Sequence, residues 1–112
     1  MKKLNNTHGS VLAIRQELQQ QSTELATQLQ RSVQRATSVD HLPCDEYGAE
    51  VARQHALAEE LLFVQHCRNA LERSVAKGSS RLVWRWQGGG RSEVRFRREN
   101  NHIAMLVRQH TA

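Results

Sequence analysis

The period at which apolar residues recur changes at Gly78, and no other feature of the sequence constrains the fold as strongly. Before Gly78, apolar residues recur every three or four positions, which is the period of one face of an α-helix. After Gly78 they alternate with polar residues, which is the period of a β-strand with one buried face. We therefore predict an α+β fold, in which a long antiparallel helical hairpin (residues 10–78) precedes a three-stranded antiparallel β-meander (residues 79–112) that packs on it.

The chain has the length of a single domain, 112 residues, and residues 10–112 are predicted to form it. Residues 1–9 are mostly polar and include Gly9. We predict that they form a flexible N-terminus.

Two helices are predicted, over residues 10–37 and 45–77. Ser10 is a favourable N-cap for the first, and Gly78 suits the position that follows the second. Because fewer than ten residues connect them, the helices should pack antiparallel. The residues expected to face one another are Leu18, Leu25 and Leu29 on the first helix, and Leu57, Leu61, Val64 and Leu71 on the second.

The second helix has a wider apolar stripe than the narrow, Gln-flanked seam of the first. The excess is centred on residues 61–64. It should meet either the sheet or a second copy of the chain, and the latter would make the protein a homodimer through this helix.

Glycines at 88–90 and polar residues at 98–101 predict the two turns of the meander. By alternation, Trp84, Trp86 and Phe96 share the apolar face, so we predict that they belong to the core and do not stack on bases. The arginines of the opposite face are Arg81, Arg85, Arg95, Arg97 and Arg108.

The net charge of +5 is concentrated in this predicted sheet, since residues 78–112 contain seven arginines and only two glutamates. The planar Arg guanidinium binds phosphate or carboxylate at two points. We therefore predict that the arginine face binds nucleic acid or an acidic protein surface. No basic amphipathic helix is present, so a membrane is not expected as a partner.

No group of residues has the pattern of a catalytic or metal site. His41 and Cys44 have ligand-like spacing, but no second pair follows at a comparable spacing. The glycines at 88–90 lie in a predicted hairpin and do not open a helix, as a phosphate-binding loop would. We expect a protein that is not an enzyme and that has neither a metal nor another cofactor.

Cys44 and Cys67 both fall in the second predicted helix, about 35 Å apart at 1.5 Å per residue, which is too far for a disulfide. Free thiols are typical of a reducing compartment. A Gln-rich segment stands where a signal peptide would have its apolar core, and no apolar run has the length of a membrane span. These features predict a cytoplasmic location.

Acidic residues gather around the connection between the helices: Asp40, Asp45, Glu46 and Glu50. Carboxylates at a helix N-terminus are favoured by the helix dipole, so capping alone explains them. In outline, a coiled-coil finger over residues 10–78 with an acidic tip resembles the Gre and DksA families, which act in the secondary channel of bacterial RNA polymerase. The C-terminal part departs from both, because it has neither a four-cysteine zinc finger nor a β-domain as large as that of the Gre proteins. The resemblance implies that the acidic tip contacts a protein.

These features predict a small non-enzymatic regulatory or accessory protein, of the kind that bacteria, phages and plasmids encode, which acts through its arginine face. One alternative is a protein-directed regulator or inhibitor that acts through the acidic tip, for example on bacterial RNA polymerase. A second alternative is a coiled-coil adaptor or chaperone. A nucleic-acid binder should lose affinity steeply with salt, whereas the alternatives predict a stoichiometric protein partner or self-association.

Overall fold

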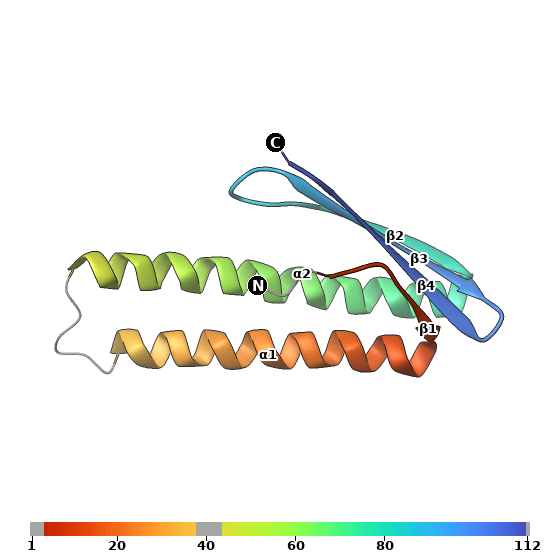
Figure 1. Cartoon of the computed structure of the whole chain (residues 1–112), viewed down its shortest axis with the longest axis horizontal. Coiled ribbons are helices and arrows are strands. Elements are labelled where there is room, and N and C mark those ends of the chain that lie inside the picture. The colour runs from red at the N-terminus through yellow and green to blue at the C-terminus, as the bar shows by residue number, and fades with distance from the viewer. Residues whose placement is uncertain (1–3, 38–43, 112) are drawn as a thin grey trace.

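The computed structural model describes residues 4–37 and 44–111, the side chains of residues 37, 44 and 45 excepted. Its helices and strands follow along the chain as β1 (Thr7–Ser10), α1 (Val11–Thr37), α2 (Cys44–Lys77), β2 (Ser79–Arg85), β3 (Arg91–Glu99) and β4 (His102–His110). Figure 1 shows α1 and α2 side by side and antiparallel, with the strands in a separate layer. The predicted α+β class is confirmed.

The sheet has four strands, so the prediction of three is wrong. Its order is β1-β4-β3-β2 and every neighbouring pair is antiparallel. The sequence predicts a flexible N-terminus through residue 9, but β1 pairs with β4 from Thr7 opposite Met105 to Ser10 opposite His102. The pairing supplies backbone partners to an edge of β4 that would otherwise lack them. Next to it, the Asn6 Oδ1 atom accepts a hydrogen bond of 2.7 Å from the Val107 N–H.

The residues predicted to face one another on the two helices all belong to the hydrophobic core. Most of them are buried, and Leu29 and Leu61 are half-buried. At the start of α1, Ser10 acts as the predicted N-cap, accepting a hydrogen bond of 3.1 Å from the Ala13 N–H. Nearby, the Arg15 Nε atom donates to Glu72 of α2 at 2.8 Å, and this hydrogen bond lowers the pKa of the Glu72 carboxyl. The pair ties the two helices together at the end that carries the sheet.

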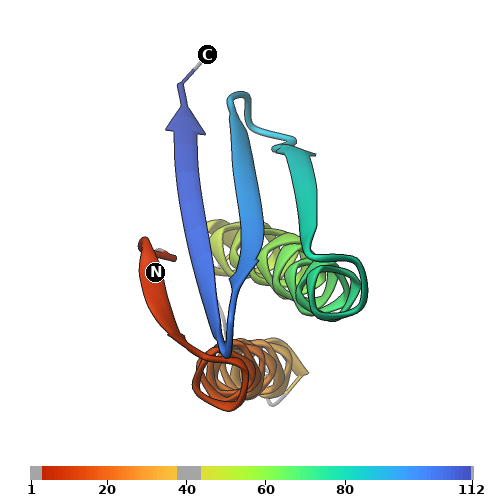
Figure 2. The same ribbon diagram turned by 90° about the vertical axis from the view of Figure 1, so that its right-hand side faces the viewer.

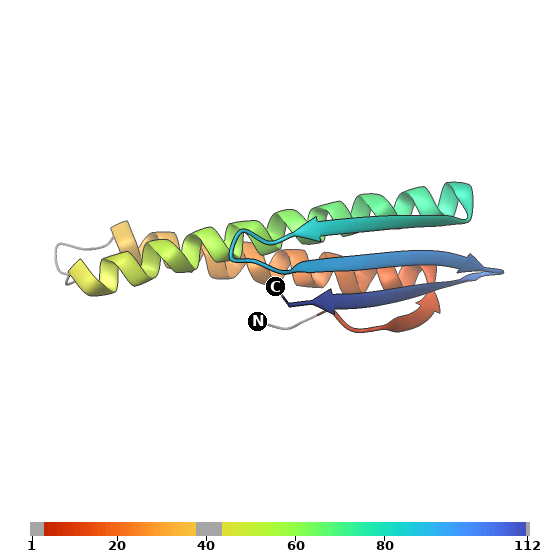
Figure 3. The same cartoon turned by 90° about the horizontal axis from the view of Figure 1, so that it is seen from above.

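The core lies where the sheet crosses the first half of α1 and the second half of α2. Phe96 on β3 is 1% exposed and packs among fully buried residues of both layers. These residues are Ile14, Leu18, Val64, Cys67, Ala70, Leu71, Val94, Ile103 and Met105. The sheet covers only this part of the helix pair, and the other half of each helix extends beyond it (Figures 1 and 3), giving an elongated molecule of 56 × 30 × 18 Å.

Trp84 and Trp86 face the helices as predicted, but they are only half-buried, unlike Phe96. Their rings contact Phe63 of α2, with centroid distances of 5.8 Å and 5.0 Å. Trp84 lies in β2, the edge strand of the sheet, and Trp86 directly follows that strand, so no further strand covers their outer side.

Cys67 is a free, fully buried thiol in α2, and burial raises its pKa to about 12. Cys44 begins the same helix, so about 35 Å separates the two residues at 1.5 Å per residue.

Replacing Phe96 with Ala should lower the free energy of unfolding by about 3–5 kcal/mol, because a buried ring is lost and a cavity remains. Urea denaturation measures this change. Val83→Ala is the matched control: Val83 lies on the opposite face of the same sheet and is 43% exposed, so its loss should stay below about 1 kcal/mol. Equal losses in the two variants would contradict the assignment of the inner face as the core.

Candidate anion-binding face

The outer face of the sheet points away from both helices (Figure 2) and is rich in arginine. Strand alternation places alternate residues of β2, β3 and β4 there, and the cross-strand register aligns them in rows. All five arginines predicted for this face lie on it and are exposed, and Arg91 joins them. The face therefore carries Arg81, Arg85, Arg91, Arg95, Arg97 and Arg108.

Glu93 divides these arginines into two groups. It lies on β3 in the same face, and its side chain is only 10% exposed because Arg81 and Arg95 cover it. Arg81 Nη2 and Arg95 Nε each lie 2.7 Å from a different oxygen of the Glu93 carboxylate. Arg81 and Arg95 are direct cross-strand partners, so their like charges face each other. The negative charge of Glu93 offsets the repulsion between them.

The hydrogen bond from Arg81 and the positive charges of Arg81 and Arg95 lower the pKa of the Glu93 carboxyl, although its burial acts in the opposite direction. Glu93 is therefore ionised at neutral pH and serves as an internal counterion for two of the six arginines. Those two have less free charge to offer an external anion.

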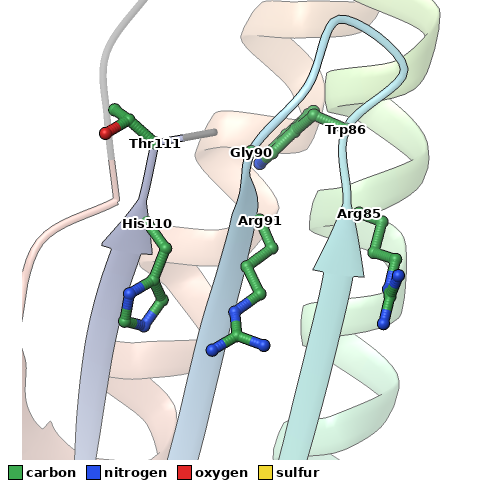
Figure 4. Close-up of a pocket in the computed structure, with 6 residues that line it drawn as sticks. All are labelled: Arg85, Trp86, Gly90, Arg91, His110 and Thr111. Carbon is green, nitrogen blue, oxygen red and sulfur yellow. The ribbon is translucent and has the colours of Figure 1, made fainter.

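Three cationic or titratable side chains form a row at the end of the sheet near the β2–β3 turn. Arg85 pairs with Arg91 across β2 and β3, and Arg91 pairs with His110 across β3 and β4. Figure 4 shows the three side chains projecting from adjacent strands on the same side of the sheet. They line an open hollow of about 500 Å³ together with Trp86, Gly90 and Thr111. None of the three forms an ion pair with a carboxylate within the described residues.

The turn beside this row depends on glycine. Gly89 and Gly90 have φ angles of 103° and 84°, which L side chains rarely adopt, and the Trp86 N–H donates to the Gly90 carbonyl at 3.1 Å. The turn brings Arg91 directly opposite Arg85.

The other end of the face has a more mixed charge. Arg97 lies 3.9 Å from the Glu99 carboxylate, and His8 of β1 lies 3.4 Å from the same group. The His8 ring also stacks on His102 at a centroid distance of 5.3 Å. Free positive charge is thus concentrated on Arg85, Arg91 and Arg108, towards the β2–β3 turn.

The sequence prediction omits Arg91 and His110 and gives Glu93 no role. Arg91 has the parity of Arg95 and Arg97, so extending the alternation back to the glycine turn would have identified it. His110 has the parity of Arg108, but it lies beyond the last apolar residue of its strand, so the sequence does not indicate that the strand extends to it. Alternation within β3 places Glu93 beside Arg95, two residues away, but the ion pair with Arg81 depends on a diagonal cross-strand register, which alternation within one strand does not give.

The structure describes the side chains of two of the four residues of the predicted acidic tip, Glu46 and Glu50. Asp40 and the side chain of Asp45 lie outside the described residues, and Glu46 is exposed. Glu50 is half-buried and accepts a hydrogen bond from the Ser32 hydroxyl of α1. Gln54 Nε2 donates to the carbonyl of the same serine, Ser32, at 3.3 Å. Glu50 and Gln54 of α2 thus both bind Ser32 of α1 and form polar contacts between the two helices.

Within residues 4–37 and 44–111, no group of three or more His, Cys, Asp or Glu residues is placed to hold a metal ion. His41, half of the ligand-like pair noted in the sequence, lies outside this part. Over the same residues, neither helix is long and apolar enough to span a membrane.

Comparison of the chain with protein-family models, with curated protein sequences and with solved structures found no match.

Replacing Glu93 with Gln should lower the melting temperature at pH 7, because the variant keeps the shape of the side chain and loses its charge. A carboxyl whose pKa is lowered by folding stabilises the protein above its ordinary pKa, and this contribution disappears as the pH falls through the lowered value. The difference in melting temperature from the native protein should therefore close below about pH 4.

Calorimetry across pH 3–7 measures this difference. Glu24→Gln removes an exposed carboxylate in the middle of α1 and should leave the melting temperature nearly unchanged. A Glu93→Gln variant that melts with the native protein at pH 7 would show that the two ion pairs contribute nothing to stability.

Proposed function

We propose that this protein binds nucleic acid through the outer face of its sheet, as a small non-enzymatic regulatory or accessory protein. The observation that carries the proposal is the charge of that face: six exposed arginines share an uncovered surface with only two glutamates. One of these glutamates is already covered by two of the arginines.

The geometry favours contacts to phosphates over contacts to bases. Trp84 and Phe96 lie on the inner face, so no aromatic ring of β2 or β3 is presented for base stacking. The guanidinium groups of Arg85, Arg91 and Arg108 are forked donors that suit phosphate oxygens. Such contacts position a nucleic acid without reading its sequence, so binding should be largely independent of sequence.

The arrangement also spreads charge along a track. Neighbouring strands lie about 4.8 Å apart, and residues two apart in one strand lie about 6.6 Å apart, so the arginines form a two-dimensional array that can contact several phosphates at once. Because their positions are fixed by paired strands, little backbone order has to be gained on binding.

The joint replacement of Arg85, Arg91 and Arg108 with Gln should weaken binding to a short oligonucleotide and flatten its salt dependence. Each lost phosphate contact reduces the slope of log K against log salt by about 0.7–0.9, so the slope should fall by about two units. Fluorescence anisotropy over a salt series measures both quantities, with single-stranded and duplex DNA of the same sequence as probes.

The matched control replaces Arg31, Arg53 and Arg73 with Gln. These exposed helical arginines form no ion pair within the described residues, and their loss changes the net charge by the same three units. An equal effect of both triple variants would contradict a site on the sheet. Binding that persists unchanged in the sheet variant would likewise contradict a site on the sheet.

Glu93→Gln should act in the opposite direction on binding. It releases Arg81 and Arg95 from their shared counterion and adds one unit of positive charge to the face. The affinity for the same oligonucleotide should rise and its salt dependence should steepen. An unchanged affinity would show that this part of the face does not touch the nucleic acid.

A further inference from the structure

The outer edge of β2 is open and regular within the described part of the chain. The strand is the last in the order β1-β4-β3-β2, and it runs for seven residues from Ser79 to Arg85. An exposed strand edge presents unpaired N–H and C=O groups to which another extended chain can pair.

The register shows which backbone groups are free. The Arg98 N–H donates to the Gly78 carbonyl at 2.8 Å, and the Trp86 N–H to the Gly90 carbonyl at 3.1 Å. Hydrogen-bonded and non-hydrogen-bonded pairs alternate in an antiparallel ladder, so residues 80, 82 and 84 direct their backbone groups towards β3. Residues 79, 81, 83 and 85 therefore direct theirs towards the open edge.

A hydrogen bond to α2 confirms this direction. Gln87 is the next residue in the outward-facing series, and its N–H donates to the Glu59 carboxylate of α2 at 2.9 Å. The contact also ends the open edge after Arg85. The free groups thus belong to a short stretch with a defined end and a helix beside it.

Apolar side chains on the inner face of the sheet are partly exposed at this edge. Leu82 and Trp84 on β2 are half-buried, whereas Val94 and Phe96 on β3 are fully buried. On α2, the Leu62 side chain is 52% exposed. An open hollow of about 590 Å³ lies beside their contact, and its lining includes His55, Ala58, Glu59, Leu62, Trp84 and Arg85.

We propose that the β2 edge binds an extended segment of a partner protein in which acidic and apolar residues alternate. The segment would add a fifth, antiparallel strand, in the manner of β-strand addition. Its acidic side chains would lie opposite Arg81 and Arg85 on the outer face, because opposite charges on directly paired residues stabilise a sheet. Its apolar side chains would point to the other face and cover Leu62 and Trp84.

Charge distinguishes an acidic partner from a second copy of the chain that pairs about Val83. Antiparallel pairing of two β2 strands about Val83 would place Arg81 of each copy opposite Arg85 of the other. Like charges in that position destabilise the pair, whereas Asp or Glu in the partner removes the conflict.

The test uses synthetic seven-residue peptides in which Glu alternates with Val, compared with peptides in which Lys alternates with Val. Titration followed by tryptophan fluorescence should show saturable binding of the Glu peptide alone. Val83→Pro removes only an outward-facing N–H, and proline is tolerated in an edge strand at such a position. It should weaken peptide binding by about tenfold or more, whereas Val83→Ala, which keeps the N–H, should bind like the native protein.

A charge-reversal variant keeps the proposal falsifiable if Val83→Pro does not fold. Joint replacement of Arg81 and Arg85 with Glu should reverse the preference, so that the Lys peptide binds and the Glu peptide does not. Absence of saturable binding of the Glu peptide by the native protein would overturn the proposal. So would a native dimer that Val83→Pro converts to a monomer, since the edge would then hold a second copy. Leu62→Ser on α2 lies off the arginine face, so it should weaken peptide binding and leave the nucleic-acid affinity unchanged, which separates this inference from the proposed function.

Discussion

The close packing of β2 and β3 on the second half of α2 is the contact on which the rest of the structure depends. Ala70 is fully buried there, and its small side chain lets the sheet approach the helix closely. The Ser80 hydroxyl donates to the Ala70 carbonyl, and Arg98 Nη1 donates to the Val75 carbonyl, so side chains on β2 and β3 are fixed to the helix backbone. This packing decides which face of every strand is buried. By strand alternation it also decides that the arginines project into solvent.

The outer face is organised by one carboxylate as much as by its arginines. Glu93 holds Arg81 and Arg95 together and limits the charge that they present. Arg85, Arg91 and Arg108 have no such partner within the described residues. The face is therefore polarised, with its uncompensated charge near the glycine turn.

The periodicity of the sequence is sufficient to predict both helices, the strands that follow them and the side of the sheet on which the arginines lie. It could not predict β1, because residues 7–10 contain no alternation of apolar and polar residues and their pairing with β4 is long-range in sequence. Alternation likewise assigns Trp84 and Phe96 to one face, but their burial depends on strand order, which places Trp84 at an edge. For the candidate site, alternation identifies five of the six arginines, whereas the ion pair between Glu93 and Arg81 follows only from the register between strands.

The pairing of β1 with β4 has a consequence for the order in which the protein can fold. Both helices leave the ribosome before any of β2, β3 and β4, yet Ile14 and Leu18 reach full burial only when Ile103 and Met105 are in place. The pairing of β1 likewise cannot form until Met105, the partner of Thr7 on β4, has been synthesised. Contacts between residues so distant in sequence require a long loop to close, which slows folding relative to local contacts. The nascent helices therefore expose apolar residues until β4 has been synthesised. The core of the domain can close only when β4 pairs and packs.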